Sequence, residues 1–139
     1  MTLEIASSAV PERAELADLY GAVGWAAYTN NLDALERALH GSSHVVTARE
    51  DGRLVGLARV VSDGATIAYL QDILVHPEQQ GSGVGKRLVA DVLEPFAAVR
   101  QQVLLTDDEP RQRAFYESLG FAEIRDFGDG TLRAFVKFN

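Results

Sequence analysis

The sequence predicts one domain of the mixed α/β (α+β) class, and three observations support this. The chain has 139 residues, which is enough for one hydrophobic core without cross-links. Segments whose apolar residues alternate with a period of two are followed by segments with helical spacing. The second half places a strand, a glycine-rich turn and a helix in succession, the order of a crossover between parallel strands. We therefore expect a mixed central sheet of six to seven strands and about four helices within residues 1–139.

The first forty residues predict two helices after a short strand. Apolar and polar residues alternate over Thr2–Ile5, which favours a strand. Pro11 and the acidic residues after it open a helix that we expect to run to about Tyr20. A second helix is expected over Leu32–Leu39. The segment between them, GAVGWAAYTNN at residues 21–31, contains the only tryptophan and is rich in Gly and Asn. Such a composition is typical of a bent connector.

The middle of the chain has the pattern of strands. Residues 44–50 (HVVTARE) and 53–62 (RLVGLARVVS) flank Asp51-Gly52, which predicts a hairpin with a tight turn. A third strand is expected over residues 66–75 (TIAYLQDILV). Because successive side chains of a strand point to opposite faces, Asp72 falls on the same face as three apolar residues. A carboxylate on an apolar face is a candidate for a special role.

The last third predicts two more helices and three more strands. An amphipathic helix is expected from Val84 to about Phe96, with its last turn disturbed by a proline, and a buried strand over residues 102–106 (QVLLT). Residues 110–120 (PRQRAFYESLG) predict a helix that begins at a proline and stops at a glycine. Two strands, at residues 121–127 and 131–138, are expected to close the chain across a GDG turn.

Charge and hydropathy argue against nucleic acid and membranes as partners, and they bear on the expected compartment. The formal net charge is −7 and no basic stripe is present, so nucleic acid is not an expected partner. No apolar run is long enough to span a bilayer, and the first residues lack the pattern of a signal peptide. We therefore expect a cytoplasmic protein with no membrane contact.

Metal chemistry is not expected either. The chain has no cysteine, which excludes a disulfide, a thiolate nucleophile and cysteine-ligated zinc. His40 and His44 are four residues apart, a spacing that can bind a metal on a helix. The glycine between them interrupts a helix, however, and no third ligand accompanies them. We predict no metal site.

The turn after the third strand carries Gly81, Gly83 and Gly85, followed at once by Lys86. Such turns bind phosphates, because bare backbone lets N–H groups approach an anion at the positive end of a helix. The nucleotide P-loop pattern fails at two positions. Gln80 stands where the pattern requires its first glycine, and a basic residue stands where it requires Ser or Thr. The dinucleotide pattern G-x-G-x-x-G fails as well, since Lys86 stands at its last glycine. A glycine turn without a ligand remains the simpler alternative.

Two motifs in order point to one family. Gln80, Gly83 and Gly85 fit the pattern Gln/Arg-x-x-Gly-x-Gly/Ala in HPEQQGSGVGKRLV, which resembles the acetyl-CoA pyrophosphate loop of the GNAT N-acetyltransferase superfamily. About thirty residues later, RAFYESLGFAEI is similar to the Phe-Tyr-x-x-Leu-Gly-Phe signature of the same family. The resemblance covers roughly residues 44–126. It implies a GNAT fold in which the cofactor strand and its neighbour splay apart.

The resemblance also implies how acetyl-CoA is held. Its pantetheine arm would bond to the backbone of the splayed strand at Ile73, Leu74 and Val75. The pyrophosphate would lie on the turn, whose members are Gln80, Gly81, Ser82, Gly83, Val84, Gly85 and Lys86. The family often has Asn and Ala where this chain has Glu109 and Gln112. The cofactor contact of that Asn is therefore not carried over.

Two residues are candidates for the chemistry of acyl transfer. The resemblance assigns Tyr116 to the leaving thiolate, as general acid. The pKa of a phenol is about 10 and that of a thiol about 8.5, so a phenol protonates a thiolate only when it is favourably placed. The expected role of Tyr116 is therefore as much hydrogen bonding as proton transfer. Asp72 is the provisional base that takes the proton of the amine. Two alternatives stay open for Asp72: a hydrogen-bonded structural residue, or a site whose only base is water.

The acceptor side is the least determined. Trp25 and Tyr28 lie where the variable first loop of the family covers the acceptor, and an aromatic wall would suit a small cationic amine. The alternative is that Trp25 belongs to the core. The sequence predicts an enzyme that moves acetyl from acetyl-CoA to a primary amine of a small molecule or peptide. A non-catalytic acyl-CoA-binding module is the competing hypothesis, and the resemblance also allows a homodimer.

Overall fold

A five-stranded sheet organises the first part of the chain. The computed structural model describes residues 2–7 and 9–139. The chain divides into two units, and the boundary lies after residue 105. The strand order in the sheet is β1-β2-β3-β4-β5. Neighbours are antiparallel from β1 to β4, whereas β4 and β5 are parallel. The strands are β1 Leu3–Ser7, β2 His44–Glu50, β3 Arg53–Ser62, β4 Ile67–Val75 and β5 Gln101–Leu104.

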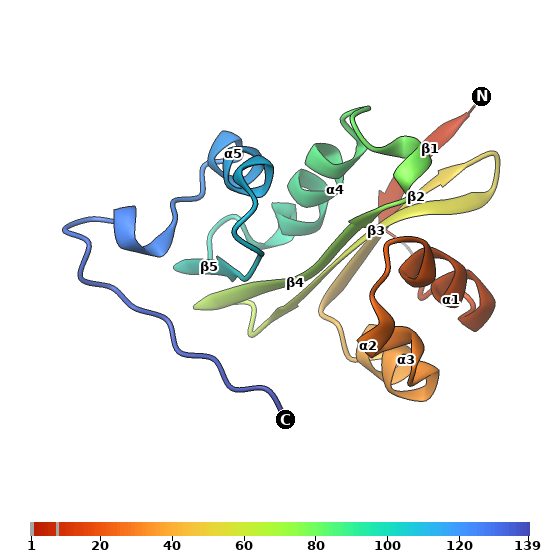
Figure 1. The fold of residues 1–139 in the computed structure, drawn as a ribbon, viewed down its shortest axis with the longest axis horizontal. Coiled ribbons are helices and arrows are strands. Elements are labelled where there is room, and N and C mark those ends of the chain that lie inside the picture. Colours follow the sequence, from red (N-terminus) through yellow and green to blue (C-terminus); the bar gives the residue numbers. More distant parts are fainter. Residues whose placement is uncertain (1, 8) are drawn as a thin grey trace. The chain divides into compact units, whose positions relative to one another are not determined.

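Helices cover both faces of this sheet (Figure 1). Three lie on one face and α4 lies on the other, where it contacts β2, β3 and β4. The helices of this unit are α1 Arg13–Ala22, α2 Ala26–Thr29, α3 Leu32–His40 and α4 Val84–Leu93, with the 3-10 turns η1 Pro77–Gln79 and η2 Glu94–Phe96. The extra helix α2 occupies four residues of the predicted connector. Five α-helices are therefore present among the described residues, against about four expected.

Local sequence explains where the first helices begin. Glu12 and Glu15 form a reciprocal capping box at the start of α1, which satisfies backbone N–H groups that no helical carbonyl reaches. The side chain of Asn31 accepts a hydrogen bond from the N–H of Ala34 at 3.1 Å and starts α3 in the same way. The Asn31 cap also marks the end of the connector between α1 and α3.

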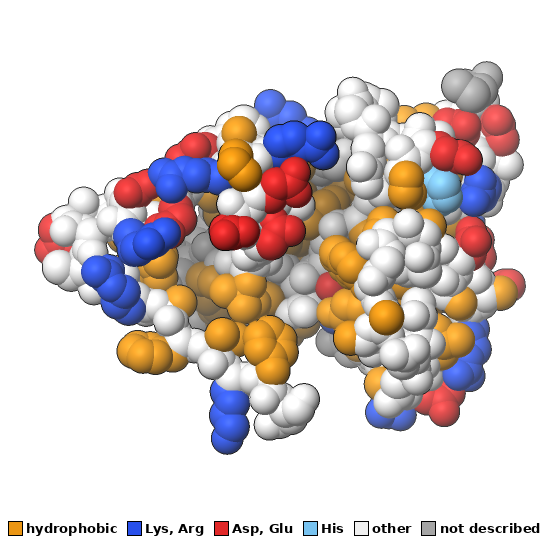
Figure 2. Space-filling view, in the orientation of Figure 1, with side chains coloured by type: hydrophobic (Ala, Val, Ile, Leu, Met, Phe, Trp, Pro, Cys, Tyr) orange, Lys and Arg blue, Asp and Glu red, His pale blue; other side chains and the backbone are white. Residues whose placement is uncertain are grey.

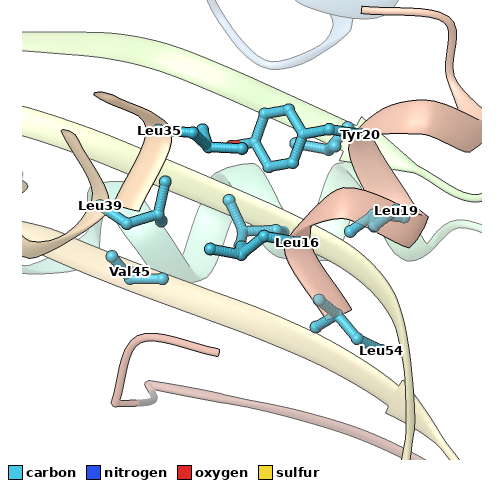
Figure 3. Packing of buried hydrophobic residues seen from close by; sticks show 9 residues of the cluster. Leu16, Leu19, Tyr20, Leu35, Leu39, Val45 and Leu54 are labelled. Atoms are coloured by element: carbon cyan, nitrogen blue, oxygen red, sulfur yellow. The ribbon is translucent and has the colours of Figure 1, made fainter. Parts of the chain in front are cut away.

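One part of the core lies between these helices and the sheet, and another lies at α4, where Leu88, Val89 and Val92 are buried. Leu16, Leu19 and Tyr20 of α1 are fully buried, and they pack with leucines of α3 and apolar residues of β2 and β3 (Figure 3). Side-chain burial alternates strictly along β4, where residues 68, 70, 72 and 74 are buried. The predicted alternation of burial is confirmed, and Asp72 is among the buried residues. Leu70 and Asp72 pair with consecutive residues of β3, however, so these two side chains do not share one face as predicted.

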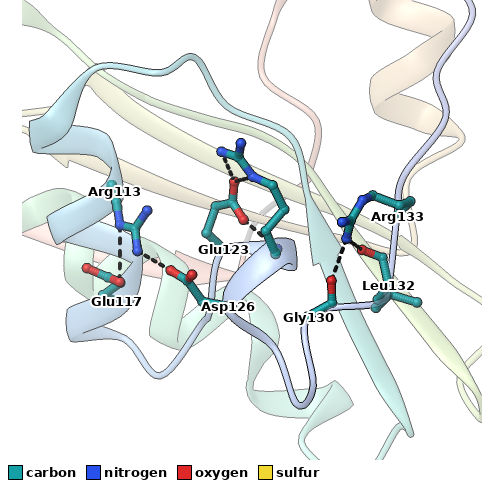
Figure 4. A network of polar contacts seen from close by, with 8 residues as sticks. Arg113, Glu117, Glu123, Asp126, Gly130, Leu132 and Arg133 are labelled. Carbon is teal, nitrogen blue, oxygen red and sulfur yellow. Dashed lines mark hydrogen bonds and ion pairs between the residues drawn. The ribbon is translucent and has the colours of Figure 1, made fainter.

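The second unit contains a helix and no strand among its described residues. Helix α5 spans Pro110–Ser118 and the 3-10 turn η3 spans Ile124–Asp126. Arg113 joins the two elements, because it pairs with Glu117 at 3.3 Å and also with Asp126 (Figure 4). These charged contacts link α5 to η3.

The strands predicted at residues 121–127 and 131–138 are wrong, so the sheet has five strands and not six to seven. The apolar alternation on which they rested is real, but Phe135 is 97% exposed and Phe138 is 84% exposed. Alternation indicates which face a strand would bury, and it supplies no neighbouring strand to pair with. The mixed α/β class is nevertheless confirmed. The prediction of one domain over residues 1–139 stays a prediction.

Candidate functional site

Strand β4 has two neighbours at its beginning and one at its end. It pairs with β3 from Ala68 to Val75, whereas its parallel pairing with β5 covers only Ile67 to Leu70. From residue 71 onward, no strand among the described residues pairs with the second edge of β4. An exposed row of unpaired N–H and C=O groups can bind an extended ligand as if it were another strand. The resemblance implies a splayed strand pair at this place, and the pairing of β4 with β5 does stop short of the end of β4.

The pairing of β4 with β3 contains a β-bulge, next to the residue at which the pairing of β4 with β5 ends. Arg59 pairs with Asp72 and Val60 pairs with Leu70, which leaves Gln71 as the extra residue of β4. A bulge bends its strand and re-aims a side chain. Here the bulge follows the last residue of β4 that pairs with β5, and it lets the side chains of Gln71 and Asp72 both reach Tyr28.

Alternate residues on this part of β4 point their backbone groups to opposite edges. The N–H of His76 donates to the carbonyl of Val55 on β3 at 2.7 Å, so the backbone of Leu74 faces β3 too. Ile73 and Val75 then face the open edge, and the Val75 carbonyl there accepts from Nε2 of Gln80 at 3.1 Å. Of the three predicted backbone contacts, Ile73 and Val75 lie on the open edge and Leu74 does not.

The glycine turn that follows β4 depends on left-handed backbone. Gly81 has φ +83° and Gly83 has φ +87°, and the space beside both is open. Conformation, rather than crowding, requires glycine at these two positions. Gly83 is the residue before α4, and Gly85 is the second residue of that helix.

The same turn presents free backbone donors. The N–H of Arg87 is the first in α4 to find a carbonyl, that of Gly83 at 3.3 Å. Over the described part of the chain, the N–H groups of residues 82–86 have no acceptor. Unpaired N–H groups at the start of a ten-residue helix carry partial positive charge and attract anions. The turn and the open edge therefore suit a linear ligand with a phosphate at one end.

Side-chain charge adds little to this turn. Lys86 is exposed, and Arg87 is directed to Asp91 at 3.9 Å, an ordinary helix-surface pair. On the face drawn in Figure 2, basic and acidic side chains are interspersed and do not gather into a stripe of one sign. The predicted phosphate site therefore rests on the backbone donors of residues 82–86 more than on Lys86.

Asp72 lies at the centre of a buried polar cluster. Its Oδ2 accepts from Nε of Arg59 at 2.6 Å and from the hydroxyl of Tyr20 at 2.9 Å. Its Oδ1 accepts from the hydroxyl of Tyr28 at 2.9 Å. Asp72 is 2% exposed and Arg59 is 5% exposed, so each charge depends on the other inside the protein. The cluster links α1, α2, β3 and β4 at one point.

These contacts bear on the two predicted roles of Asp72. A carboxylate that accepts three hydrogen bonds, one from a buried guanidinium, has its charge balanced and has little lone-pair capacity left for a substrate proton. The geometry matches the structural alternative, and a role as base stays a prediction. Burial, with the nearby charge of Asp72, raises the pKa of the Tyr20 and Tyr28 hydroxyls and keeps them as donors.

Trp25 and Tyr28, the predicted acceptor wall, lie beside this cluster. Trp25 packs edge-on against Tyr20 with ring centroids 5.9 Å apart, and Tyr28 does so at 5.2 Å. Both are partly buried against the core. The structure thus brings Tyr28 and Asp72 together. One side of Trp25 packs against the core, in agreement with the alternative that Trp25 belongs to it.

Tyr116 belongs to the second unit, on α5. Its ring packs edge-on against Phe115 at 5.0 Å and Phe121 at 6.1 Å, the aromatic residues of the predicted signature. Burial, with the charge of Asp107, raises the pKa of the Tyr116 hydroxyl to about 12. That hydroxyl has no hydrogen-bond partner among the residues described. The raised pKa keeps this hydroxyl protonated at neutral pH.

Sequence reasoning missed two members of the cluster, Arg59 and Tyr20, and also Gln71, whose Nε2 donates to the hydroxyl of Tyr28. Arg59 and Tyr20 are distant from Asp72 in sequence, by 13 and 52 residues. Only the polar character of Arg59 in a run of buried strand residues gave a signal. Gln71 gave none, because no glycine or proline marks its bulge.

Two expected absences can be compared with the described residues. Within this part of the chain, no group of three His, Cys, Asp or Glu side chains is placed to hold a metal ion. Likewise, none of the helices described is long and apolar enough to cross a bilayer.

Comparison with known proteins identifies the family. Residues 12–135 match the model of the acetyltransferase (GNAT) domain. A GNAT family acetyltransferase of Streptococcus pneumoniae has a solved structure with a TM-score of 0.85 and 30% identity, over 99% of this chain and 98% of that one. The N-acetyltransferase ycf52 of Pyropia yezoensis, itself uncharacterized, is 30% identical over 116 residues. That match covers 81% of this chain and only 66% of the relative.

A more distant structure shares the fold alone. AAC(6')-Iy, solved in complex with the bisubstrate analog CoA-S-monomethyl-acetylneamine, has a TM-score of 0.71 at 19% identity, over 100% of this chain and 99% of that one. Together, the family match and the relatives confirm the resemblance found in the glycine turn and the Phe-Tyr signature. The chain belongs to the GNAT acetyltransferase domain family, a family of acyltransferase enzymes.

Proposed function

We propose that the protein transfers an acetyl group from acetyl-CoA to a primary amine of a small molecule or peptide. One observation carries the proposal: the open edge of β4 leads directly into a turn with unpaired N–H groups. A ligand that combines an extended amide arm with a pyrophosphate matches both features. The CoA-containing analog bound to AAC(6')-Iy, which shares the fold, supports this choice.

The chain's own groups would hold the cosubstrate at two places. Ile73 and Val75 offer backbone groups to the amide arm on the open edge, although the Val75 carbonyl is engaged by Gln80. The N–H groups of residues 82–86 would receive the pyrophosphate oxygens at the positive end of α4. Glycine at 81 and 83 permits the left-handed backbone of this turn. Bound acetyl-CoA supplies the activated acyl group.

In the proposed reaction the neutral amine nitrogen attacks the thioester carbonyl carbon. A C–N bond forms, the C–S bond breaks, the amine loses one proton and the departing thiolate gains one. Tyr116 would donate a hydrogen bond to that sulfur. Its pKa of about 12 lies well above that of a thiol, about 8.5, so we assign it hydrogen bonding more than full proton transfer.

The proton of the amine has two predicted destinations, Asp72 and water. Asp72 accepts from Arg59, Tyr20 and Tyr28, and this supports a structural role. We therefore propose that water removes the amine proton. On this view the rate rises with pH as the amine itself becomes neutral, and the profile shifts with the pKa of the chosen amine.

The test mixes purified protein and acetyl-CoA with a panel of amines and follows free thiol. Wild type turns over at least one primary amine, and Tyr116→Phe lowers kcat about ten- to a hundredfold with CoA affinity unchanged. Equal kcat in the variant would remove Tyr116 from the mechanism. Tight CoA binding without turnover of any amine would instead favour the non-catalytic acyl-CoA-binding module.

Thermal shift separates CoA from a nucleotide as the ligand of the turn. A ligand that binds only the folded state raises the melting temperature, and the rise grows with the logarithm of its concentration above Kd. We expect CoA to raise it and ATP to leave it unchanged at equal concentration. The opposite result would contradict the proposed cosubstrate.

A further inference from the structure

The open edge of β4 has two ends, and only one is explained by the proposed cosubstrate site. The turn at residues 82–86 lies beyond Val75, and the bulge at Gln71 lies at the other end, where β5 begins to pair. A linear ligand anchored at the turn and extended along this edge therefore ends near Gln71. If the proposed function holds, its acyl end and the incoming amine meet there.

The side chain of Gln71 has a fixed orientation at this end. Its Nε2 donates to the hydroxyl oxygen of Tyr28 at 3.1 Å, and the same hydroxyl donates its proton to Oδ1 of Asp72 at 2.9 Å. Consecutive strand residues normally point to opposite faces, yet Gln71 and Asp72 both reach Tyr28, which the bulge permits.

Hydrogen-bond capacity determines which end of the amide is left over. A phenol has one proton, and that of Tyr28 is committed to Asp72. Gln71 can therefore approach Tyr28 only as a donor, through its NH₂ group. Its carbonyl oxygen Oε1 then has no partner among the described residues, and the side chain is exposed. Arg59, which balances the charge of Asp72, keeps this order of donors fixed.

We propose that Oε1 of Gln71 accepts a hydrogen bond from an N–H of the acceptor amine, and that Tyr28 is the residue that positions it. This inference rests on the proposed function and adds the residue that selects the acceptor. An acceptor oxygen beside the acyl end binds the amine within reach of the thioester carbonyl, equally in the ground state and in the transition state. Gln71 is then a specificity residue, and Tyr28 and Asp72 act through it.

The test compares steady-state kinetics of three variants with an amine that wild type uses. Gln71→Met keeps the length of the side chain and removes the amide. We expect the KM for the amine to rise about tenfold, the value of one hydrogen bond, with kcat within about twofold and CoA affinity unchanged. Tyr28→Phe leaves the amide without its partner, and we expect a rise of about threefold. Tyr69→Phe removes a hydroxyl from the same strand and serves as the matched control, with unchanged KM.

The double variant distinguishes positioning from a general structural role. If Tyr28 acts through Gln71, then Gln71→Met with Tyr28→Phe is no worse than Gln71→Met alone. Multiplication of the two effects, to about thirtyfold, would overturn the role of Tyr28. A wild-type KM in Gln71→Met, in a protein that turns over amines, would overturn the inference and leave the proposed function standing. A wild type that turns over no amine would overturn both.

Discussion

The polar cluster around Asp72 and the glycine turn after β4 are built in opposite ways. The cluster consists of side chains from four elements and is almost completely buried, with Asp72 at 2% and Arg59 at 5% exposure. The turn is continuous in sequence, exposed, and works through backbone N–H groups. The charges and polar groups of the cluster therefore need partners within the fold, whereas the turn leaves N–H donors free for a ligand. Stability should depend on the first and ligand affinity on the second.

Removal of the buried carboxylate should have the largest effect. Asp72→Ala leaves the Arg59 charge buried without a partner, and we expect the free energy of unfolding to fall by about 3–5 kcal/mol. Urea denaturation measures this change. Lys86→Ala, in the exposed turn, should change it by less than about 0.5 kcal/mol.

A paired replacement provides the control for that experiment. Arg59→Met with Asp72→Leu removes both charges together, and apolar replacement of a buried pair is often neutral. We expect the double variant to regain most of the lost stability. Equal stability of Asp72→Ala and Lys86→Ala would contradict the view that the buried pair is part of the framework.

A side chain in the turn should act on the ligand instead. Gly83→Val forces a β-branched residue into φ +87°, so we expect CoA affinity to fall at least about tenfold. Gly64 has φ +78° and open space beside it, in the connection between β3 and β4. Gly64→Val carries comparable backbone strain, about 1–2 kcal/mol, away from the turn. Calorimetric CoA titration of both variants isolates the effect on the ligand, and equal affinities would contradict the proposed phosphate site.

The two regions also differ in how far the sequence predicts them. The turn was predicted because its information is local: Gly81 and Gly83 stand where left-handed backbone is needed, directly before a helix. Asp72 was predicted only as a carboxylate on an apolar face. Its partners come from positions 13, 44 and 52 residues away, and period-two alternation says nothing about such contacts.

The same limit explains the errors in the fold. Alternation at residues 121–127 and 131–138 predicted strands, but a strand requires a neighbour, and Phe135 lies 97% exposed without one. The bulge at Gln71 depends on the register between β3 and β4, which no residue type announces. Local signals therefore gave the class, the hairpin and the turn, and pairing between distant segments decided the rest.

Alkaline pH should act on the cluster and spare the turn. Burial, followed by the charge of Asp72, raises the pKa of Tyr20 above its ordinary value of about 10. Below pH 10 the phenol is neutral in both states and its stabilisation is fully present. As pH rises further, the unfolded phenol ionises while the folded one does not, so stability is lost. For Tyr20 alone we expect a loss of about 1 kcal/mol between pH 10 and pH 11.

Comparison of denaturation curves at these two pH values checks the assignment. Tyr20→Phe starts from a lower stability, because Asp72 loses a donor, about 1–3 kcal/mol. Between pH 10 and pH 11, the free energy of unfolding should nevertheless fall less in the variant than in wild type. The difference between the two losses should be about 1 kcal/mol. Gly83→Val alters the turn, which contains no tyrosine, and should keep the wild-type slope. If Tyr20→Phe keeps the wild-type slope as well, then Tyr20 is not a buried donor to Asp72, and the cluster is not as closed to water as its geometry indicates.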